Sequence, residues 1–212
     1  MQPISSDKPE STGVNPPILA PAAQKEMAKG VEQFRQNDMK EARKHFEKVL
    51  AMAPAYPDIH FLMGALELQE KNVAAAQADV EKAIELFPNH APSLELLGGM
   101  YCQRGEPQKG AVLLEKAASL EDGSWYVHWK LGSAYLQMNE PKKARQQAER
   151  ELQLGKGAAG RAQILRARAL VHLDQLDVAE ECLVRFVHDQ PDDPAAAEAR
   201  AFLVQLKKRQ QD

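Results

Sequence analysis

The sequence predicts an all-α protein built from about five stacked helix-turn-helix units and a final capping helix. Three observations support this prediction. Glycine recurs at an interval of 34 residues, at Gly30, Gly64, Gly98 and Gly132. Good helix formers such as Ala, Leu, Glu, Gln, Lys and Arg, which lose little rotamer freedom in a helix, dominate the composition. Within each interval, apolar residues recur at the three- and four-residue spacing of a helix face.

The N-terminal segment differs from the rest of the chain. Residues 1–21 contain five prolines among Ser, Thr, Asn and Gly residues, a composition that favours a flexible leader or linker over a packed core. We therefore expect the folded domain to span residues 22–210.

Each unit is expected to contain two helices that cross closely. A small residue follows each glycine by twelve positions, and in the first three units a bulky residue follows four positions later. The small column is Ala42, Ala76, Gly110 and Ala144, and the later column is Phe46, Val80, Leu114 and Ala148. Small residues let helix backbones approach each other, and the bulky residue fills the space beside them.

The unit boundaries follow from this register. Units are expected at about residues 23–56, 57–90, 91–124, 125–158 and 160–193, with an extra residue in the Gly155–Gly160 stretch. Pro54, Pro88 and Pro191 are expected to stop second helices, because proline lacks an amide donor and clashes with the preceding turn. Asn and Gly are expected at the turns within units, where they tolerate the left-handed conformation, and proline can open the next helix. These turns contain Asn37-Asp38, Lys71-Asn72, Gly105-Glu106-Pro107, Asn139-Glu140-Pro141 and Asp174-Gln175.

The last segment, residues 194–210, is expected to be a single capping helix. Its apolar stripe consists of Ala195, Ala199, Phe202, Leu203 and Leu206 on an otherwise polar helix. Such a cap is needed because the last repeat of a solenoid otherwise exposes its inner face.

A period of 34 residues with Gly, Ala, Phe and Pro in fixed columns resembles the tetratricopeptide repeat. Tyr101 and Tyr135, with Leu97 and Leu131 before them, match the aromatic and leucine positions of that family. The resemblance covers residues 23–193. It implies a right-handed α-solenoid whose first helices line a concave groove and whose second helices form the outer wall, and it implies protein or peptide partners.

The columns assigned to this groove are rich in large apolar residues. The predicted partner-binding residues are Met27, Phe34, Phe61, Leu68, Tyr126, Trp129, Leu136 and Ile164, with Arg161 and Arg168 at a basic end. Apolar groups that a core does not require often mark an interaction surface. The leading hypothesis is a scaffold or adaptor that holds a helical or extended apolar peptide, with Phe61, Tyr126 and Trp129 as anchors.

Three alternatives to this hypothesis stay open at this point. The groove residues could instead pack against neighbouring first helices, or the module could self-associate as a homo-oligomer. The basic residues of the fourth and fifth units could receive an acidic partner segment. A chaperone-type carboxylate clamp is disfavoured, because its positions here hold apolar residues such as Met27, Val31 and Leu62 rather than charged donors.

The sequence contains no pattern typical of an enzyme, a metal site or a cofactor site. It lacks nucleophile-elbow, phosphate-loop and Rossmann motifs. The six histidines show no pairing on a common helix and are expected to be partly exposed. Cys102 and Cys182, 80 residues apart, are expected to be separate thiols.

Charge and hydropathy further restrict the partners and the compartment. A net charge of -3 gives no general attraction to nucleic acid, and no apolar run is long enough to span a membrane. The cytoplasm is favoured, while a periplasmic or secreted location stays open because a signal removed before Met1 would leave no trace.

Overall fold

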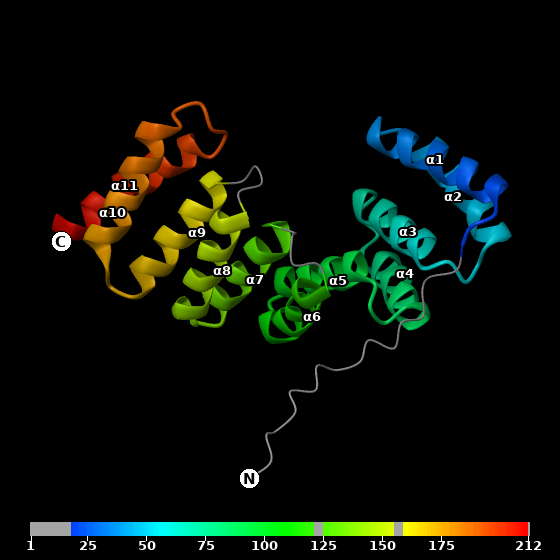
Figure 1. Cartoon of the computed structure of the whole chain (residues 1–212), viewed down its shortest axis with the longest axis horizontal. Coiled ribbons are helices and arrows are strands. Elements are labelled where there is room, and N and C mark those ends of the chain that lie inside the picture. Colours follow the sequence, from blue (N-terminus) through cyan, green and yellow to red (C-terminus); the bar gives the residue numbers. More distant parts are fainter. Residues whose placement is uncertain (1–17, 121–124, 155–158, 212) are drawn as a thin grey trace, which may run out of the picture.

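The computed structural model describes residues 18–120, 125–154 and 159–211. In these ranges the chain forms eleven α-helices, and the predicted all-α fold of stacked helix pairs is confirmed (Figure 1). The helices are α1 (Pro21–Arg35), α2 (Met39–Met52), α3 (Pro57–Gln69), α4 (Val73–Leu86), α5 (Ala91–Gln103), α6 (Pro107–Leu120), α7 (Trp125–Gln137), α8 (Pro141–Leu154), α9 (Ala159–His172), α10 (Leu176–Asp189) and α11 (Ala196–Gln211).

The turns within the five units share one backbone conformation. The residues Asn37, Lys71, Gly105, Asn139 and Asp174 all have positive φ, between 57° and 78°. This left-handed residue ends the first helix of each pair and reverses the chain into the second. Glycine adopts the conformation without steric cost, and asparagine and aspartate adopt it at low cost. Lys71 adopts it because the pairing of helices requires it.

Prolines mark the helix boundaries as expected. Pro107 and Pro141 open α6 and α8, where the missing amide would have no partner in any case. The helices α2, α4 and α10 each end two residues before Pro54, Pro88 and Pro191, respectively.

Two predicted boundaries shift by a residue or two. Helix α1 starts at Pro21, inside the predicted leader, because proline suits the first turn of a helix. Leu19, also inside the predicted leader, packs in the core of the first unit. Helix α9 starts at Ala159, one residue before the predicted fifth unit. Residues 1–17 lie outside the described residues, as do residues 155–158 of the Gly155–Gly160 stretch in which an extra residue was predicted.

Close approach of paired helices explains the glycine column. A Cβ placed on Gly30 would lie 2.5 Å from Phe46 Cε1, and one on Gly64 would lie 2.6 Å from Val80 Cγ2. The predicted fit between the small residue and the bulky one is therefore confirmed in these units. The fourth unit differs because Ala148 is too small to fill the space, and Leu165 of α9 lies 2.5 Å from the corresponding position on Gly132 instead.

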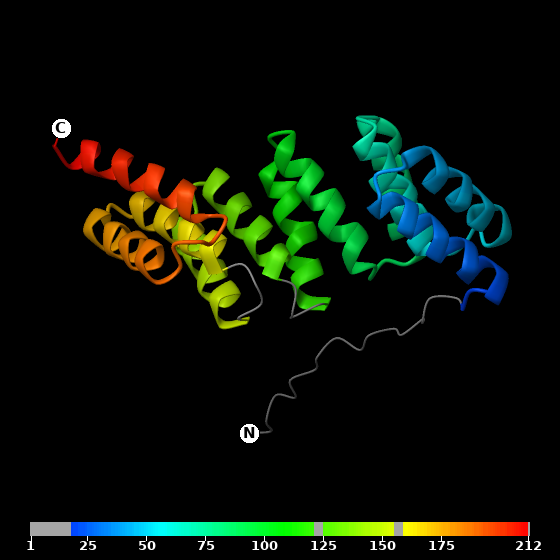
Figure 2. The same ribbon diagram turned by 90° about the horizontal axis from the view of Figure 1, so that it is seen from above.

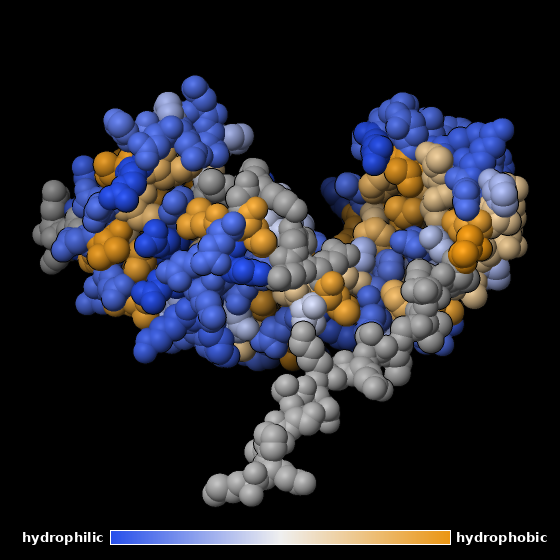
Figure 3. Space-filling view, in the orientation of Figure 1, coloured by the Kyte–Doolittle hydropathy of each residue, from blue (hydrophilic) through white to orange (hydrophobic). Residues whose placement is uncertain are grey.

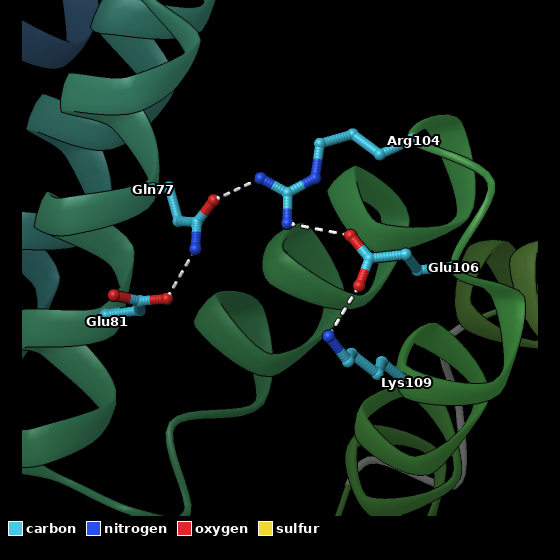
Figure 4. Close-up of polar contacts among 5 residues, drawn as sticks. All are labelled: Gln77, Glu81, Arg104, Glu106 and Lys109. Atoms are coloured by element: carbon cyan, nitrogen blue, oxygen red, sulfur yellow. Dashed lines mark hydrogen bonds and ion pairs between the residues drawn. The ribbon is translucent and has the colours of Figure 1, made fainter.

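Polar contacts join the second helix of one unit to the first helix of the next. Arg43 on α2 forms an ion pair of 2.8 Å with Glu70, which follows α3. One repeat later, Arg104 donates a hydrogen bond of 2.7 Å to Gln77 on α4 and also pairs with Glu106 (Figure 4). Both contacts join residues 27 positions apart, so the same two repeat positions meet in each. The arginine belongs to the earlier unit in the first contact and to the later unit in the second.

The units together form a curved array. Viewed from above, the helix pairs follow one another in a row from α1 to α11 (Figure 2). The two ends of the row turn toward the same side, so α1–α3 and α9–α11 face each other across a hollow (Figure 1). Hydrophobic residues show on both walls of this hollow (Figure 3).

The last helix covers the end of the array. Ala199 and Leu206 of α11 are buried in the core of the fifth unit, and Phe202 and Leu203 pack at its edge. The expected apolar stripe of the cap is therefore the face by which α11 packs onto α10.

Candidate functional site

An aromatic cluster lies at the start of α7. The rings of Tyr126 and Trp129 stack with centroids 5.5 Å apart and an interplanar angle of 15°, and Trp125 contacts Tyr126 edge-on at 5.4 Å. The stack forms because residues three apart are neighbours on a helix surface. Tyr126 is 36% exposed, so part of the cluster is open to solvent.

Two cations lie over these rings. The Arg161 guanidinium carbon of α9 is 5.6 Å from the Trp129 centroid and 6.0 Å from that of Trp125. The Lys130 ammonium is 4.5 Å from the Tyr126 centroid, and it also forms an ion pair of 2.9 Å with Glu95 on α5. Cations are attracted to the negative face of an aromatic ring, so these contacts fix both side chains against the cluster.

Two adjoining pockets extend from the cluster along α7, α9 and α11. The aromatic pocket, of about 360 Å³, is lined by Tyr126, Trp129, Arg161, Ile164, Arg168 and Glu198. The cap pocket, of about 370 Å³, is lined by Leu136, Arg168, Val171, His172, Glu198, Ala201, Phe202 and Gln205. An ion pair of 2.8 Å between Arg168 and Glu198 is common to both. We call the two pockets together the C-terminal groove.

Comparisons with known proteins identify the repeat. Two sequence families described as tetratricopeptide repeat match residues 33–98 and 130–194. The chain belongs to the tetratricopeptide repeat (TPR) family. Proteins of this family generally mediate protein–protein interactions and are typically non-catalytic. No curated protein sequence matches the chain.

Several solved TPR structures share the fold. MamA has a TM-score of 0.67 at 21% identity, with 80% of this chain and 92% of that chain covered. A TPR protein from Parabacteroides merdae has a TM-score of 0.71 at 18% identity, with 89% and 75% covered. YrrB, described as a TPR protein with an unusual peptide-binding site, has a TM-score of 0.67 at 16% identity, with 84% and 92% covered.

The structure brings together six of the ten predicted groove residues. These six line the C-terminal groove: Tyr126, Trp129, Leu136, Arg161, Ile164 and Arg168. One of them lies deeper than the other five. Ile164 is only 4% exposed and belongs to the core shared with α10 and α11, so it forms the floor of the aromatic pocket and is not an accessible anchor.

The other four predicted residues lie on α1 and α3, at the opposite end of the array. Met27 and Phe34 are half-buried against the core of the first units, and Phe34 contacts Phe46 at 6.5 Å between centroids. Phe61 is half-buried with its ring 5.8 Å from that of His90, and Leu68 is half-buried. These side chains contribute to packing between helices as well as to the surface.

The sequence prediction missed the contribution of the cap helix. Glu198, Ala201, Phe202 and Gln205 of α11 line the cap pocket, although the cap was expected only to close the array. The 34-residue period could have predicted this contribution, because Glu198 and Phe202 lie one period after the groove residues Ile164 and Arg168. The cap therefore continues the repeat columns by which α7 and α9 line the C-terminal groove.

Helix α8 contributes a buried glutamate that interacts electrostatically with Arg161. Glu151 of α8 is 3% exposed, and within the described parts of the chain neither carboxylate oxygen has a hydrogen-bond partner. Burial raises the pKa of Glu151 to about 7, while the positive charge of Arg161 acts in the opposite direction. The corresponding residues of the other units, Val49, Ala83, Ala117 and Phe186, are buried and apolar.

Two histidines were expected to be partly exposed, and that expectation is wrong. His90 and His128 are each 6% exposed, because both lie between packed helices. His90 contacts Ser93 Oγ at 2.6 Å and Asp58 Oδ1 at 3.2 Å. This trio has the residue types of a nucleophilic triad, but Ser93 is fully buried and offers no access to a substrate. Hydrogen bonding to His90 lowers the pKa of Asp58. Because His90 contacts Asp58 of α3 and Ser93 of α5, the trio links these two helices.

Neither a metal-binding cluster nor a membrane-spanning helix is present among the described residues. There, no group of three or more His, Cys, Asp or Glu residues could hold a metal ion. The same residues include no helix with the length and apolar character to cross a membrane. Cys102 and Cys182 are free, and burial raises the pKa of both thiols.

Proposed function

We propose that this TPR protein is a non-catalytic adaptor whose concave surface binds a helical or extended segment of another protein. The observation that carries this proposal is the Tyr126–Trp129 stack at the mouth of the aromatic pocket. Aromatic side chains supply large contact areas at low cost in conformational entropy. A stack exposed on a first helix is therefore suited to act as an anchor for a partner.

The shape and the family both support this proposal. The two pockets form a depression along three consecutive first helices, and an amphipathic helix or extended peptide can lie in such a groove. YrrB, which has the same fold, is described as having a peptide-binding site. Phe61 is retained as a further anchor, although its contact with His90 leaves less of its ring free.

The substitution Trp129→Ala tests this function. Full-length protein carrying the substitution should capture less of the partners retained by the wild type, while its helical circular dichroism signal stays unchanged. Truncating a central aromatic anchor typically costs about 2 kcal/mol or more of binding free energy. Val112→Ala is the matched control, because Val112 is 65% exposed on α6, a second helix.

The outcomes separate this function from its alternatives. Capture that survives Trp129→Ala would remove Trp129 from the site, and loss of the helical signal would identify Trp129 as a core residue. Self-association would instead give an apparent molar mass, measured by light scattering, that rises with protein concentration and is reduced by the same substitution.

A further inference from the structure

The charges of the C-terminal groove differ in sign from those of the whole chain. The chain has a net charge of -3. The aromatic pocket, in contrast, is lined by Arg161, Arg168 and Glu198, which leaves one positive charge in excess. Local charge of this kind selects partners of opposite sign and accelerates their association.

The three cations beside the aromatic cluster are not equally available to a partner. The Lys130 ammonium is engaged with Glu95, and only 16% of the Lys130 side chain is exposed. Arg161 lies over the indole rings, and no carboxylate of the described residues lies within ion-pair distance of it. A guanidinium stacked on an aromatic ring can still donate hydrogen bonds from its edge to a carboxylate. Arg161 is therefore a positioned donor at the mouth of the pocket.

Arg168 already binds a carboxylate that belongs to the same chain. Glu198 reaches from α11 to Arg168, and both side chains are more than half exposed, at 55% and 54%. Exposed ion pairs contribute little stability, so another carboxylate can replace Glu198 at small cost. The pair also lies where the two pockets meet.

Apolar surface lies on both sides of this pair. Tyr126 and Trp129 line the aromatic pocket on one side, and Leu136, Val171 and Phe202 line the cap pocket on the other. An occupant that matches the groove therefore has an acidic residue in the middle and large apolar side chains on either side.

We propose that the C-terminal groove binds an acidic peptide segment in which Asp or Glu is flanked by large apolar residues, and that its carboxylate displaces Glu198 from Arg168. This inference rests on the proposed function and specifies the chemistry of the partner. Glu198 acts as an internal competitor, so its removal strengthens binding while removal of either arginine weakens it.

Selection from a library of random 12-residue peptides displayed on phage tests the partner chemistry with full-length protein. Recovered peptides should place Asp or Glu between large apolar residues. Binding of one synthetic recovered peptide is then measured by tryptophan fluorescence, since Trp125 and Trp129 are the two tryptophans of the chain and both lie at the groove. The same peptide with Asn or Gln in place of its acidic residues serves as the control and should bind at least about tenfold more weakly.

Three variants with exposed substituted side chains measure the roles of the charges. Arg161→Gln and Arg168→Gln should each weaken the binding of the acidic peptide by about tenfold or more, because each substitution removes a charge-assisted hydrogen bond. Glu198→Gln should strengthen the binding of this peptide by up to about fivefold, because the peptide no longer has to displace one exposed ion pair. Melting temperatures close to that of the wild type should accompany all three.

The results separate failure of this inference from failure of the proposed function. Recovery of neutral or basic peptides whose binding depends on Trp129 would overturn the acidic partner and leave the adaptor function standing. Unchanged or weaker binding by Glu198→Gln would overturn the displacement of Glu198. Recovery of peptides that bind the Trp129→Ala variant as tightly as the wild type would overturn both proposals.

Discussion

Gly98 and Gly99 are neighbours on α5 but face different surroundings. A Cβ on Gly98 would lie 2.9 Å from Leu114 Cγ and 3.0 Å from the carbonyl oxygen of Gly110, whereas one on Gly99 would lie 3.4 Å from the flexible end of Lys130. The first glycine is required by helix packing, whereas a methyl group at the second would only come into ordinary contact with the end of the Lys130 side chain.

We therefore predict opposite effects of alanine at these two positions. Gly98→Ala should destabilise the protein by about 1–3 kcal/mol, because the helix backbones must separate. Gly99→Ala should be neutral or stabilising by up to about 1 kcal/mol, since alanine favours a helix interior over glycine. Urea unfolding of both variants measures the difference. Equal effects at the two sites would contradict the close approach of α5 and α6.

Glu151 predicts a pH dependence of stability. Its pKa is raised from 4.5 to about 7 in the folded protein, so the folded state holds the proton more tightly than the unfolded chain. The contribution of Glu151 to the free energy of unfolding is therefore fully present below pH 4.5 and is lost as the pH rises through 7. The change in pKa corresponds to at most about 3 kcal/mol.

Substitution of Glu151 by Gln should remove this dependence. Urea unfolding at pH 5 and pH 8 should show a smaller loss of stability between the two values in Glu151→Gln than in the wild type. Glu149→Gln on the same helix is the control, because Glu149 is 45% exposed and pairs with Arg145. If both variants lost stability as the wild type does, Glu151 would not be the group that titrates.

At the scale of elements, α11 both closes the array and lines the groove. Its residues Ala199 and Leu206 are buried against the fifth unit, and its residues Glu198 and Phe202 line the cap pocket. One helix therefore combines a stabilising face with a surface that faces the proposed partner.

Truncation after Asp193 should lower stability and solubility together. Loss of α11 exposes the apolar residues Leu170, Leu183 and Phe186 that now share its core, and each buried side chain of this size contributes about 1.5–3 kcal/mol. Thermal melting and the soluble fraction after expression measure the effect, with truncation after Arg209 as the control. A protein cut after Asp193 that melts like the full chain would contradict the capping role.

At the scale of the whole molecule, the periodic features of the fold could be predicted from the sequence. The 34-residue glycine column and the prolines give the pairing and the ends of helices, because their effects are local and repeat. The left-handed Lys71 and Asp174 were located at turns, although lysine does not favour that conformation.

The candidate site was less predictable because exposure depends on neighbouring helices. Trp129 and Ile164 occupy the same repeat column, yet only Ile164 is sealed, since the cap residues Ala195 and Ala199 pack in the same core. The apolar column likewise gave no sign that Glu151 would be buried with no hydrogen-bond partner among the residues that the structure describes. These features follow from contacts between units, which a single repeat pattern does not describe.

The polar contacts between units also encode the order in which the units stack. Arg43 of the first unit meets Glu70 of the second, while Gln77 of the second meets Arg104 of the third. If the first unit docked onto the third and left out the second, Arg43 would face Arg104, and two like charges would repel each other. The changed position of the arginine therefore disfavours docking of the first unit onto the third, a distinction that an array of identical repeats would lack.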